Sequence, residues 1–494
     1  MRVPPIQSRL WRLAALVLLL GMALADARAL VGAEGRGPDS VQRIELAPLG
    51  FEPQPERYLL AGGTMFTVHF VDSTHLMVTW SVRGLLKRLP DSQPNDQDRN
   101  VEAVLLELPT GKLLARTTWR MRDHANYLWS LGHGHFLLRQ RNEFSVLSPV
   151  ENLAGGDAFA LHRVLQSQRV VGFVFVSPGA DVLTVESLPP PREEGRQLTE
   201  EVHSVVQTPV QINFYRVLDE PGREVTLQYA GLVRADNPVA LPLTGEGYLD
   251  SVKDSSGTYN FDFVPYEGKR MELAAFDTTC FPHALFVSRT EFISFGCRGS
   301  DDRQQLGFFN LKGEHRWLTT FSNQHINPSI VSAPAAGRFA LERTIVNSSG
   351  LDLENLVSAE IAGEEITAYQ GEDGRPLLKV TASPVQRAGQ NFDLSSDGLE
   401  LAVIRDGNVE VYRLPELTGK DRKAIDEAAK LVPPEYRGPV RVSGDDQRDA
   451  AAAEVFTPSP GPESGNTLGD PVAGQESAAP RKPPSLYSSD YPRF

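Results

Sequence analysis

The chain has 494 residues, of which 41% are apolar, and a formal net charge of −14 at pH 7. Nucleic-acid binding needs clustered Lys and Arg side chains to neutralise phosphates, and no such cluster is present, so we expect no nucleic-acid partner. The same deficit of basic residues argues against docking on anionic lipid. The negative charge is then most simply a solubilising feature.

Residues 1–29 have the three parts of a cleavable signal peptide in order. Three arginines precede an apolar run from Leu13 to Ala25, and small residues offer cleavage after Ala25, Ala27 or Ala29. The run is shorter than the roughly 20 residues of a membrane-spanning helix, although an uncleaved anchor is the alternative. We therefore expect a secreted or periplasmic protein with no transmembrane segment after cleavage, and a monomer.

The two segments that follow differ in composition and in the spacing of their apolar residues. Residues 30–57 are rich in Gly, Pro and charge and are predicted to be a linker. Residues 58–415 contain short apolar runs, many of them alternating with period two, separated by polar or Gly/Pro turns. This pattern predicts β-strands and an all-β body.

One unit recurs through the body: an apolar strand, a small polar turn and a second apolar strand. It is found at residues 70–78, 175–185, 286–295, 331–341 and 392–403, with a looser copy at 249–261. A second hairpin often follows, and two hairpins make the four-stranded blade of a β-propeller. The body has 415 − 58 + 1 = 358 residues, about 50 for each of seven blades. We predict a single seven-bladed propeller; six or eight blades, or two β-sandwiches, are the alternatives.

Residues 392–414 carry the turn Ser395-Ser-Asp-Gly and the strand Asn408-Val-Glu-Val-Tyr. This segment resembles a blade of the WD40-like or TolB-type propellers, which have a Ser-Pro-Asp-Gly turn between their first two strands. Ser177-Pro-Gly-Ala is similar. The whole chain also resembles uncharacterised secreted bacterial propeller proteins, although it contains no Trp-Asp dipeptide. The resemblance implies a propeller fold and an interaction role, and it implies no catalytic residues.

Beyond the body, residues 419–431 have apolar side chains at helical spacing and precede Pro433-Pro434. They predict a short helix within a linker at 416–437. Residues 438–494 are mostly Pro, Ser, Gly, Asp, Glu and Ala, which bury too little apolar surface to offset the entropy of ordering. We predict a disordered Pro-rich tail there.

The only two cysteines are Cys280 and Cys297. The residues between them read as two strands around the polar turn Ser288-Arg-Thr, an arrangement that places the cysteines opposite each other. Together with export, this predicts one structural disulfide; a redox or metal site is the alternative, but no C-x-x-C motif is present.

No established motif for a catalytic nucleophile, metalloprotease, phosphate loop or dinucleotide site is present, so the catalytic residues are unknown and we expect no cofactor and no metal. His133 and His135 are weak ligand candidates, because side chains two residues apart on a strand share a face. No acidic partner is evident in the sequence, which favours solvated imidazoles in a Gly-rich turn. Acidic pairs at 301–302 and 364–365 lack the spacing of a calcium loop.

Propellers serve both as binding modules and as enzymes, so the fold does not decide between them. We expect a non-catalytic binding or scaffold protein that engages a protein, peptide or glycan of the envelope or medium through its channel mouth or loop faces. The alternative is a lyase or hydrolase acting at the channel mouth, which predicts at least two convergent carboxyl or imidazole groups with shifted pKa values.

Overall fold

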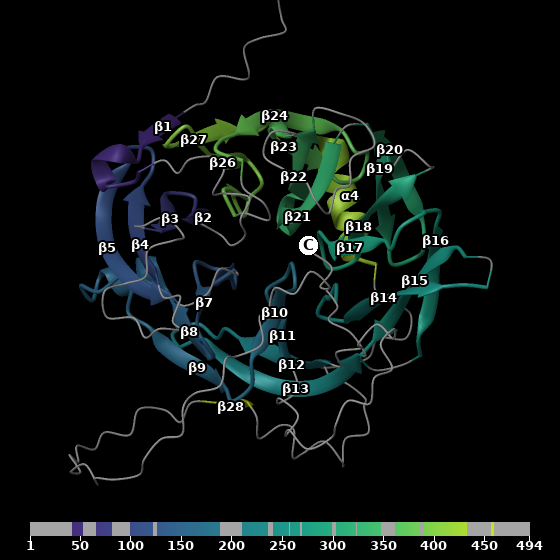
Figure 1. The fold of residues 1–494 in the computed structure, drawn as a ribbon, viewed down its shortest axis with the longest axis horizontal. Coiled ribbons are helices and arrows are strands. Elements are labelled where there is room, and N and C mark those ends of the chain that lie inside the picture. Colours follow the sequence, from purple (N-terminus) through teal and green to yellow (C-terminus); the bar gives the residue numbers. More distant parts are fainter. Residues whose placement is uncertain are drawn as a thin grey trace, which may run out of the picture. The chain divides into compact units, whose positions relative to one another are not determined.

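The computed structural model describes residues 42–52, 66–81, 99–121, 126–187, 210–235, 241–255, 257–266, 269–298, 303–322, 324–346, 361–385, 390–431 and 456–458. The predicted signal peptide lies outside these residues, and so does most of the predicted tail. Residues 40–494 belong to one compact unit, and the described residues of that unit form seven antiparallel sheets arranged in a ring (Figure 1). The predicted all-β propeller with seven blades is confirmed.

Each sheet is a blade whose strands follow one another in chain order from the inside of the ring outwards, except that the outermost strands of the second and seventh blades come from distant parts of the chain. The first three blades consist of β2 (Phe66–Asp72), β3 (His75–Ser81), β4 (Arg99–Glu107) and β5 (Lys112–Met121); of β6 (Leu128–Ser130), β7 (Phe136–Gln140), β8 (Glu143–Leu147) and β9 (His162–Ser167); and of β10 (Val171–Val176), β11 (Val182–Ser187), β12 (Val210–Leu218) and β13 (Thr226–Ala235).

The remaining blades continue the same order. They consist of β14 (Gly247–Lys253), β15 (Tyr259–Pro265) and β16 (Met271–Phe276); of β17 (His283–Phe286), β18 (Glu291–Arg298), β19 (Arg303–Asn310) and β20 (His315–Phe321); of β21 (Gln324–Ala333), β22 (Arg338–Val346), β23 (Ile361–Gln370) and β24 (Pro376–Ala382); and of β25 (Phe392–Leu394), β26 (Glu400–Arg405), β27 (Asn408–Arg413) and β1 (Gln42–Glu45).

Two blades depart from four strands. The fourth blade has three, and a single bridge between Leu243 and Tyr248 stands in place of an innermost strand. The second blade has five, because β28 (Phe456–Pro458) pairs antiparallel with the outer edge of β9. The expected four-stranded blade therefore holds for the other five sheets.

The alternating pattern of the strands is explained by burial on both faces of each blade. In β4, Val101, Ala103 and Leu105 pack toward the second blade, while Val104 and Leu106 pack toward the seventh. The described residues contain seven apolar clusters, one between each pair of neighbouring blades. Because one of them joins the last blade to the first, apolar burial runs around the whole ring.

The ring is closed by a strand from the opposite end of the sequence. β1 forms the outermost strand of the seventh blade, with Ile44 opposite Val409 and Gln42 opposite Val411 of β27. This corrects the predicted linker at 30–57, because residues 42–45 belong to the propeller. The linker prediction failed because only one of these four residues is apolar, and their strand conformation comes from pairing with β27.

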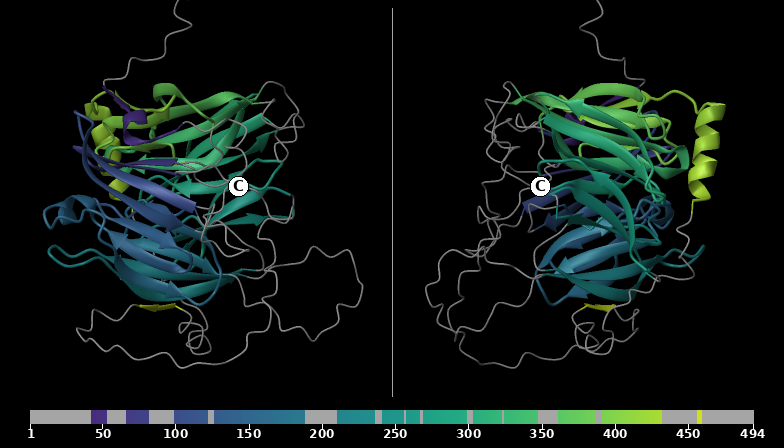
Figure 2. Two further views of the ribbon diagram at one scale, coloured as in Figure 1. Left: turned by 60° about the vertical axis from the view of Figure 1, so that its left-hand side comes forward. Right: turned by 90° about the vertical axis from the view of Figure 1, so that its right-hand side faces the viewer.

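The only α-helices in the described part of the chain are α3 (Pro149–Leu153) and α4 (Gly419–Ala429); η1 (Ala47–Leu49) and η2 (Pro334–Ala336) are 3₁₀ turns. α4 lies in the segment for which the sequence predicts a helix, and a capping box between Thr418 and Asp421 starts it. It stands against one end of the ring (Figure 2). There the Thr290 hydroxyl donates to Ala428 O at 2.8 Å.

We call this the α4 end. The turn that contains Thr290 joins the first and second strands of the fifth blade, so the equivalent turns of the other blades also lie at the α4 end. The segments that lead into each innermost strand lie at the opposite end. Residues 277–282, which contain Cys280, are one of these segments.

Candidate functional site

The disulfide between Cys280 and Cys297 is formed, as predicted, with the two Cα atoms 5.4 Å apart. Cys280 precedes β17, and Cys297 lies near the end of β18, so the bond ties the entry of the fifth blade to its second strand. Backbone hydrogen bonds reinforce it: Thr279 N donates to Cys297 O, and Cys297 N donates to the Thr278 hydroxyl, each at 3.0 Å. The segment is therefore held to the blade over three consecutive residues.

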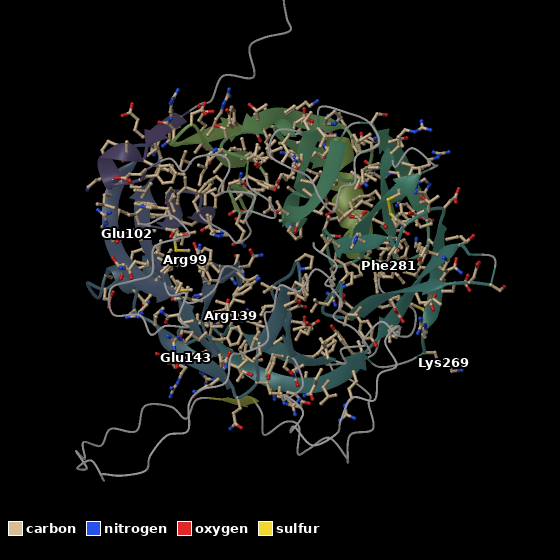
Figure 3. All side chains as sticks on the ribbon, in the orientation of Figure 1. Arg99, Glu102, Arg139, Glu143, Lys269 and Phe281 are labelled. Atoms are coloured by element: carbon tan, nitrogen blue, oxygen red, sulfur yellow. A yellow bond between two sulfur atoms is a disulfide. The ribbon has the colours of Figure 1, made fainter. Side chains whose placement is uncertain are left out.

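The next residue, Phe281, presents an aromatic ring at this fixed position. It is 49% exposed, which is the largest exposed fraction of any large apolar residue in the described part of the chain. Figure 3 labels its side chain. Its ring meets Tyr259 edge to face at 5.7 Å and His283 at 6.0 Å between centroids. His283 in turn stacks on Phe295 at 5.2 Å. We call Tyr259, Phe281, His283 and Phe295 the aromatic patch.

The electrostatics of the aromatic patch favour an apolar contact with a cationic edge. Burial lowers the pKa of His283 below its ordinary value of 6.5, so its imidazole is neutral at neutral pH. The Lys253 ammonium lies 5.2 Å from the centroid of the Tyr259 ring, within cation–π range. Edge-to-face pairs of this kind fix the orientation of each ring. The patch can therefore stack on or insert into a partner.

Removing the disulfide is expected to lower the free energy of unfolding by about 3 kcal/mol. The bond joins residues 17 positions apart. In the chain-entropy model, closing a loop of this length lowers the conformational entropy of the unfolded chain by the equivalent of that free energy. Denaturant unfolding of the oxidised protein and of the C280S/C297S variant measures the difference. Equal stabilities would contradict the expected entropic contribution of the disulfide.

The structure places His133 and His135 in the turn between β6 and β7, at the α4 end. His133 has a positive φ of 49°, and Gly132 and Gly134 flank it at 75° and 81°. This is the Gly-rich turn that the sequence favours, but only one of its imidazoles is solvated: the side chain of His133 is 85% exposed and that of His135 is 7% exposed.

The expectation that these histidines have no acidic partner was wrong. Asp219, which follows β12 in the next blade, contacts both. Its carboxylate lies 2.7 Å from His133 Nδ1 and 3.6 Å from His135 Nε2. His135 Nδ1 is 2.7 Å from the Ser148 hydroxyl. In the described residues, no group of three or more His, Cys, Asp or Glu side chains is arranged to hold a metal ion. Through Asp219, the two histidines make a polar contact between the second and third blades.

The other side chains considered from the sequence have structural partners where they are described. Glu364 accepts from the Asn391 amide at 2.6 Å, and Glu365 pairs with Arg343 and with Lys379. Residues 301–302 lie outside the described residues. The four tryptophans among the described residues also pack between blades, with Trp80 and Trp119 buried and Trp129 and Trp317 partly buried.

Two titratable groups with shifted pKa values converge on the innermost strands. Burial lowers the pKa of His69 on β2 to about 4 and raises that of Asp393 on β25 to about 7, and the two side chains approach within 4.0 Å. Convergence with shifted pKa values is what the enzyme alternative predicts. A catalytic pair must also be accessible to a substrate, and this pair is not: only 7% of the His69 side chain and 17% of the Asp393 side chain are exposed. The sequence analysis did not identify the His69–Asp393 pair. It also did not identify Asp219 or Phe281.

No family model matches the chain, and no curated protein matches it. Solved structures similar to it include an acylaminoacyl peptidase from Pyrococcus horikoshii, at 11% identity and a TM-score of 0.44, covering 76% of this chain and 55% of that one. The chain therefore spans about half the length of that peptidase.

Two further similar structures are nearly covered by the match. They are the β-propeller domain of the trilobed protease from Pyrococcus furiosus (8% identity, TM-score 0.40, 72% of this chain and 98% of that one) and a protein assigned as TolB from Agrobacterium tumefaciens (12%, 0.33, 61% and 95%). At these identities such likeness concerns the fold alone. The chain is a β-propeller by its own strand pairing, and proteins with TolB-type propellers are among its structural neighbours.

Proposed function

We propose that this chain is an exported binding propeller that holds a protein, peptide or glycan at the end of the ring opposite α4. The observation that carries the proposal is Phe281, a half-exposed aromatic side chain that immediately follows a disulfide-bonded cysteine. Tyr259 and His283 each meet its ring edge to face. Exposed aromatic rings are costly to hydrate, and they contribute strongly when a partner buries them.

Rigidity adds to this argument. Association loses affinity whenever side chains and loops must be ordered, and a surface that is already ordered avoids part of that loss. The disulfide and the hydrogen bonds of Thr278 and Thr279 fix the backbone on the N-terminal side of Phe281. The aromatic patch thus has the rigid anchor that binding sites use.

Export is part of the same proposal. It is supported by the signal-type residues 1–29 and by the disulfide, since such bonds persist in oxidising compartments. The structure contains no helix in its described residues that is long and apolar enough to cross a membrane.

The test is affinity capture from the medium and cell envelope of the producing cell, with the tagged mature chain as bait. Quantitative mass spectrometry and glycan analysis compare the wild-type bait with the Phe281→Ala variant. A matched control is Leu318→Ala, because Leu318 is 40% exposed on β20 and lies outside the aromatic patch.

We expect at least one ligand to be recovered about 30-fold less with Phe281→Ala, the effect of losing a binding hot spot of about 2 kcal/mol. Recovery with Leu318→Ala should equal that of the wild type. Ligands recovered equally by all three baits would contradict the proposed site.

A further inference from the structure

The outer edge of β9 in the second blade is regular over a short stretch. Leu165 and Arg163 lie opposite the consecutive residues Phe144 and Ser145 of β8, so β9 bulges between them. Residues 165–167 follow the bulge and carry no charge. A strand edge presents unpaired N–H and C=O groups, and proteins commonly blunt such edges with charged residues or prolines. Residues 165–167 contain neither, so they leave an edge on which another extended chain can pair.

The strand β28, from the far C-terminal part of the sequence, lies along this stretch (Figure 1). It runs antiparallel to β9, and its register matches the regular stretch residue for residue. The opposite pairs are Phe456 with Ser167, Thr457 with Gln166, and Pro458 with Leu165. The edge is therefore covered by a segment of the same length.

The backbone direction of β9 makes Thr457 the central contact. Ser167 N donates to Asn142 O at 2.7 Å, on the β8 side of the strand. The backbone polar groups of successive strand residues point to alternate sides, so those of Gln166 point outward, toward β28. Thr457 lies opposite Gln166 and is therefore the residue of β28 placed to exchange both backbone hydrogen bonds with β9.

The prolines of the segment stand where they allow this pairing and oppose any further pairing. By the same alternation, the backbone groups of Phe456 and Pro458 point away from β9. Proline has no N–H, so Pro458 loses no bond to β9 and leaves the new outer edge without a donor at that position. Pro460 and Pro462 follow in the sequence. The segment thus fits an open edge on one side and opposes strand addition on the other.

A covalent tether favours this pairing within one chain. α4 is fixed to the fifth and sixth blades, where Thr290 donates to Ala428 O at 2.8 Å and Arg375 donates to Asp421 Oδ1 at 3.1 Å. Residues 430–455 connect α4 to β28 on the second blade. A tether of this kind gives the segment an effective concentration on the order of millimolar at its site. Pairing between separate copies is therefore outcompeted in dilute solution.

We propose that the outer edge of β9 is a docking site for an extended peptide, and that residues 456–458 of the same chain occupy it as a strap. The strap covers the backbone groups of Gln166 and keeps the second blade from pairing edge to edge with another extended chain. It uses no residue of the aromatic patch, so it stands independently of the proposed function.

Hydrogen exchange of the Gln166 amide tests the strap in the full mature chain. Thr457→Pro removes the N–H that faces β9, and we expect the Gln166 amide to exchange at least about 10-fold faster, the effect of losing two backbone hydrogen bonds. Thr457→Ala keeps the N–H and should match the wild type. The Ser167 amide, which is bonded to Asn142 O, should be equally slow in all three proteins and reports that the blade stays folded.

Dilution distinguishes the strap from an exchange of segments between copies. Protection of the Gln166 amide in the wild type should be the same at about 1 µM and at about 100 µM protein, since both lie far below the effective concentration of the tethered segment. Loss of protection on dilution would mean that a second copy supplies the strand, and it would overturn pairing within one chain.

A free peptide of residues 451–462 tests the docking site itself. At about millimolar concentration, it should slow exchange of the Gln166 amide in the Thr457→Pro protein toward the wild-type rate. The same peptide carrying the Thr457→Pro substitution should have no effect. The proposal is overturned if the Gln166 amide exchanges equally fast in the wild type and in Thr457→Pro, or if the unsubstituted peptide leaves its exchange unchanged.

Discussion

Replacing Ile44 with Asp is expected to lower the free energy of unfolding by about 4 kcal/mol or more. Ile44 is buried in the apolar cluster between the seventh and first blades and pairs with Val409. The variant loses a buried aliphatic side chain and places a carboxylate without a partner in its position, and each change costs several kcal/mol. β1 then detaches from β27, and the seam that joins the two ends of the ring is weakened.

Thermal and denaturant unfolding of Ile44→Asp measure this effect. Glu45→Gln is the matched control, since Glu45 is exposed on the same strand, and it should stay within about 0.5 kcal/mol of the wild type. If both variants were equally stable, β1 would not be the strand that closes the ring.

Replacing Arg338 with Met is expected to cost about 4 kcal/mol. Arg338 is buried on β22, and its guanidinium donates to Gln370 Oε1 at 3.0 Å, Gly398 O at 2.6 Å and Pro415 O at 2.7 Å. It thereby links the sixth blade to the seventh and to the segment that leads into α4. Methionine fills part of the volume but leaves buried acceptors without donors, at about 1–3 kcal/mol each.

The control for this loss is Arg413→Met. Arg413 is 61% exposed, pairs with Glu416 at 3.0 Å and lies opposite Glu400 in the strand register, so its loss should change the free energy of unfolding by less than about 1 kcal/mol. Calorimetry of both variants compares a buried with an exposed arginine of the same chain. Similar melting temperatures would contradict the structural role given to Arg338.

Much of the fold could be predicted because its blades repeat a local pattern. The Ser395-Ser-Asp-Gly turn and its flanking alternating strands are visible in sequence, and they correspond to β25, β26 and β27. The disulfide was equally local, since its cysteines flank one hairpin. β1 could not be predicted, because its conformation depends on a partner strand more than 360 residues away.

The polar contacts were less predictable for the same physical reason. Asp219 contacts His133 from 86 residues away, and the Asp393 carboxyl reaches Phe70 N across 323 residues. Packing of the third blade against the second brings the first two groups together, and closure of the ring brings the other two together. The position of Phe281 could have been recognised from the sequence, because this aromatic residue directly follows a cysteine predicted to be disulfide-bonded.

The most direct test of the binding role is site-specific photocrosslinking at position 281. A benzoylphenylalanine replaces Phe281 in the exported chain, and a second variant carries it at Leu318. Irradiation in the producing culture should give a discrete crosslinked species when the crosslinker is at position 281. This species should be absent when the crosslinker is at position 318, and absent when the crosslinker is at position 281 of the C280S/C297S variant. If positions 281 and 318 give the same products, or position 281 gives none, the aromatic patch is not where this propeller holds its partner.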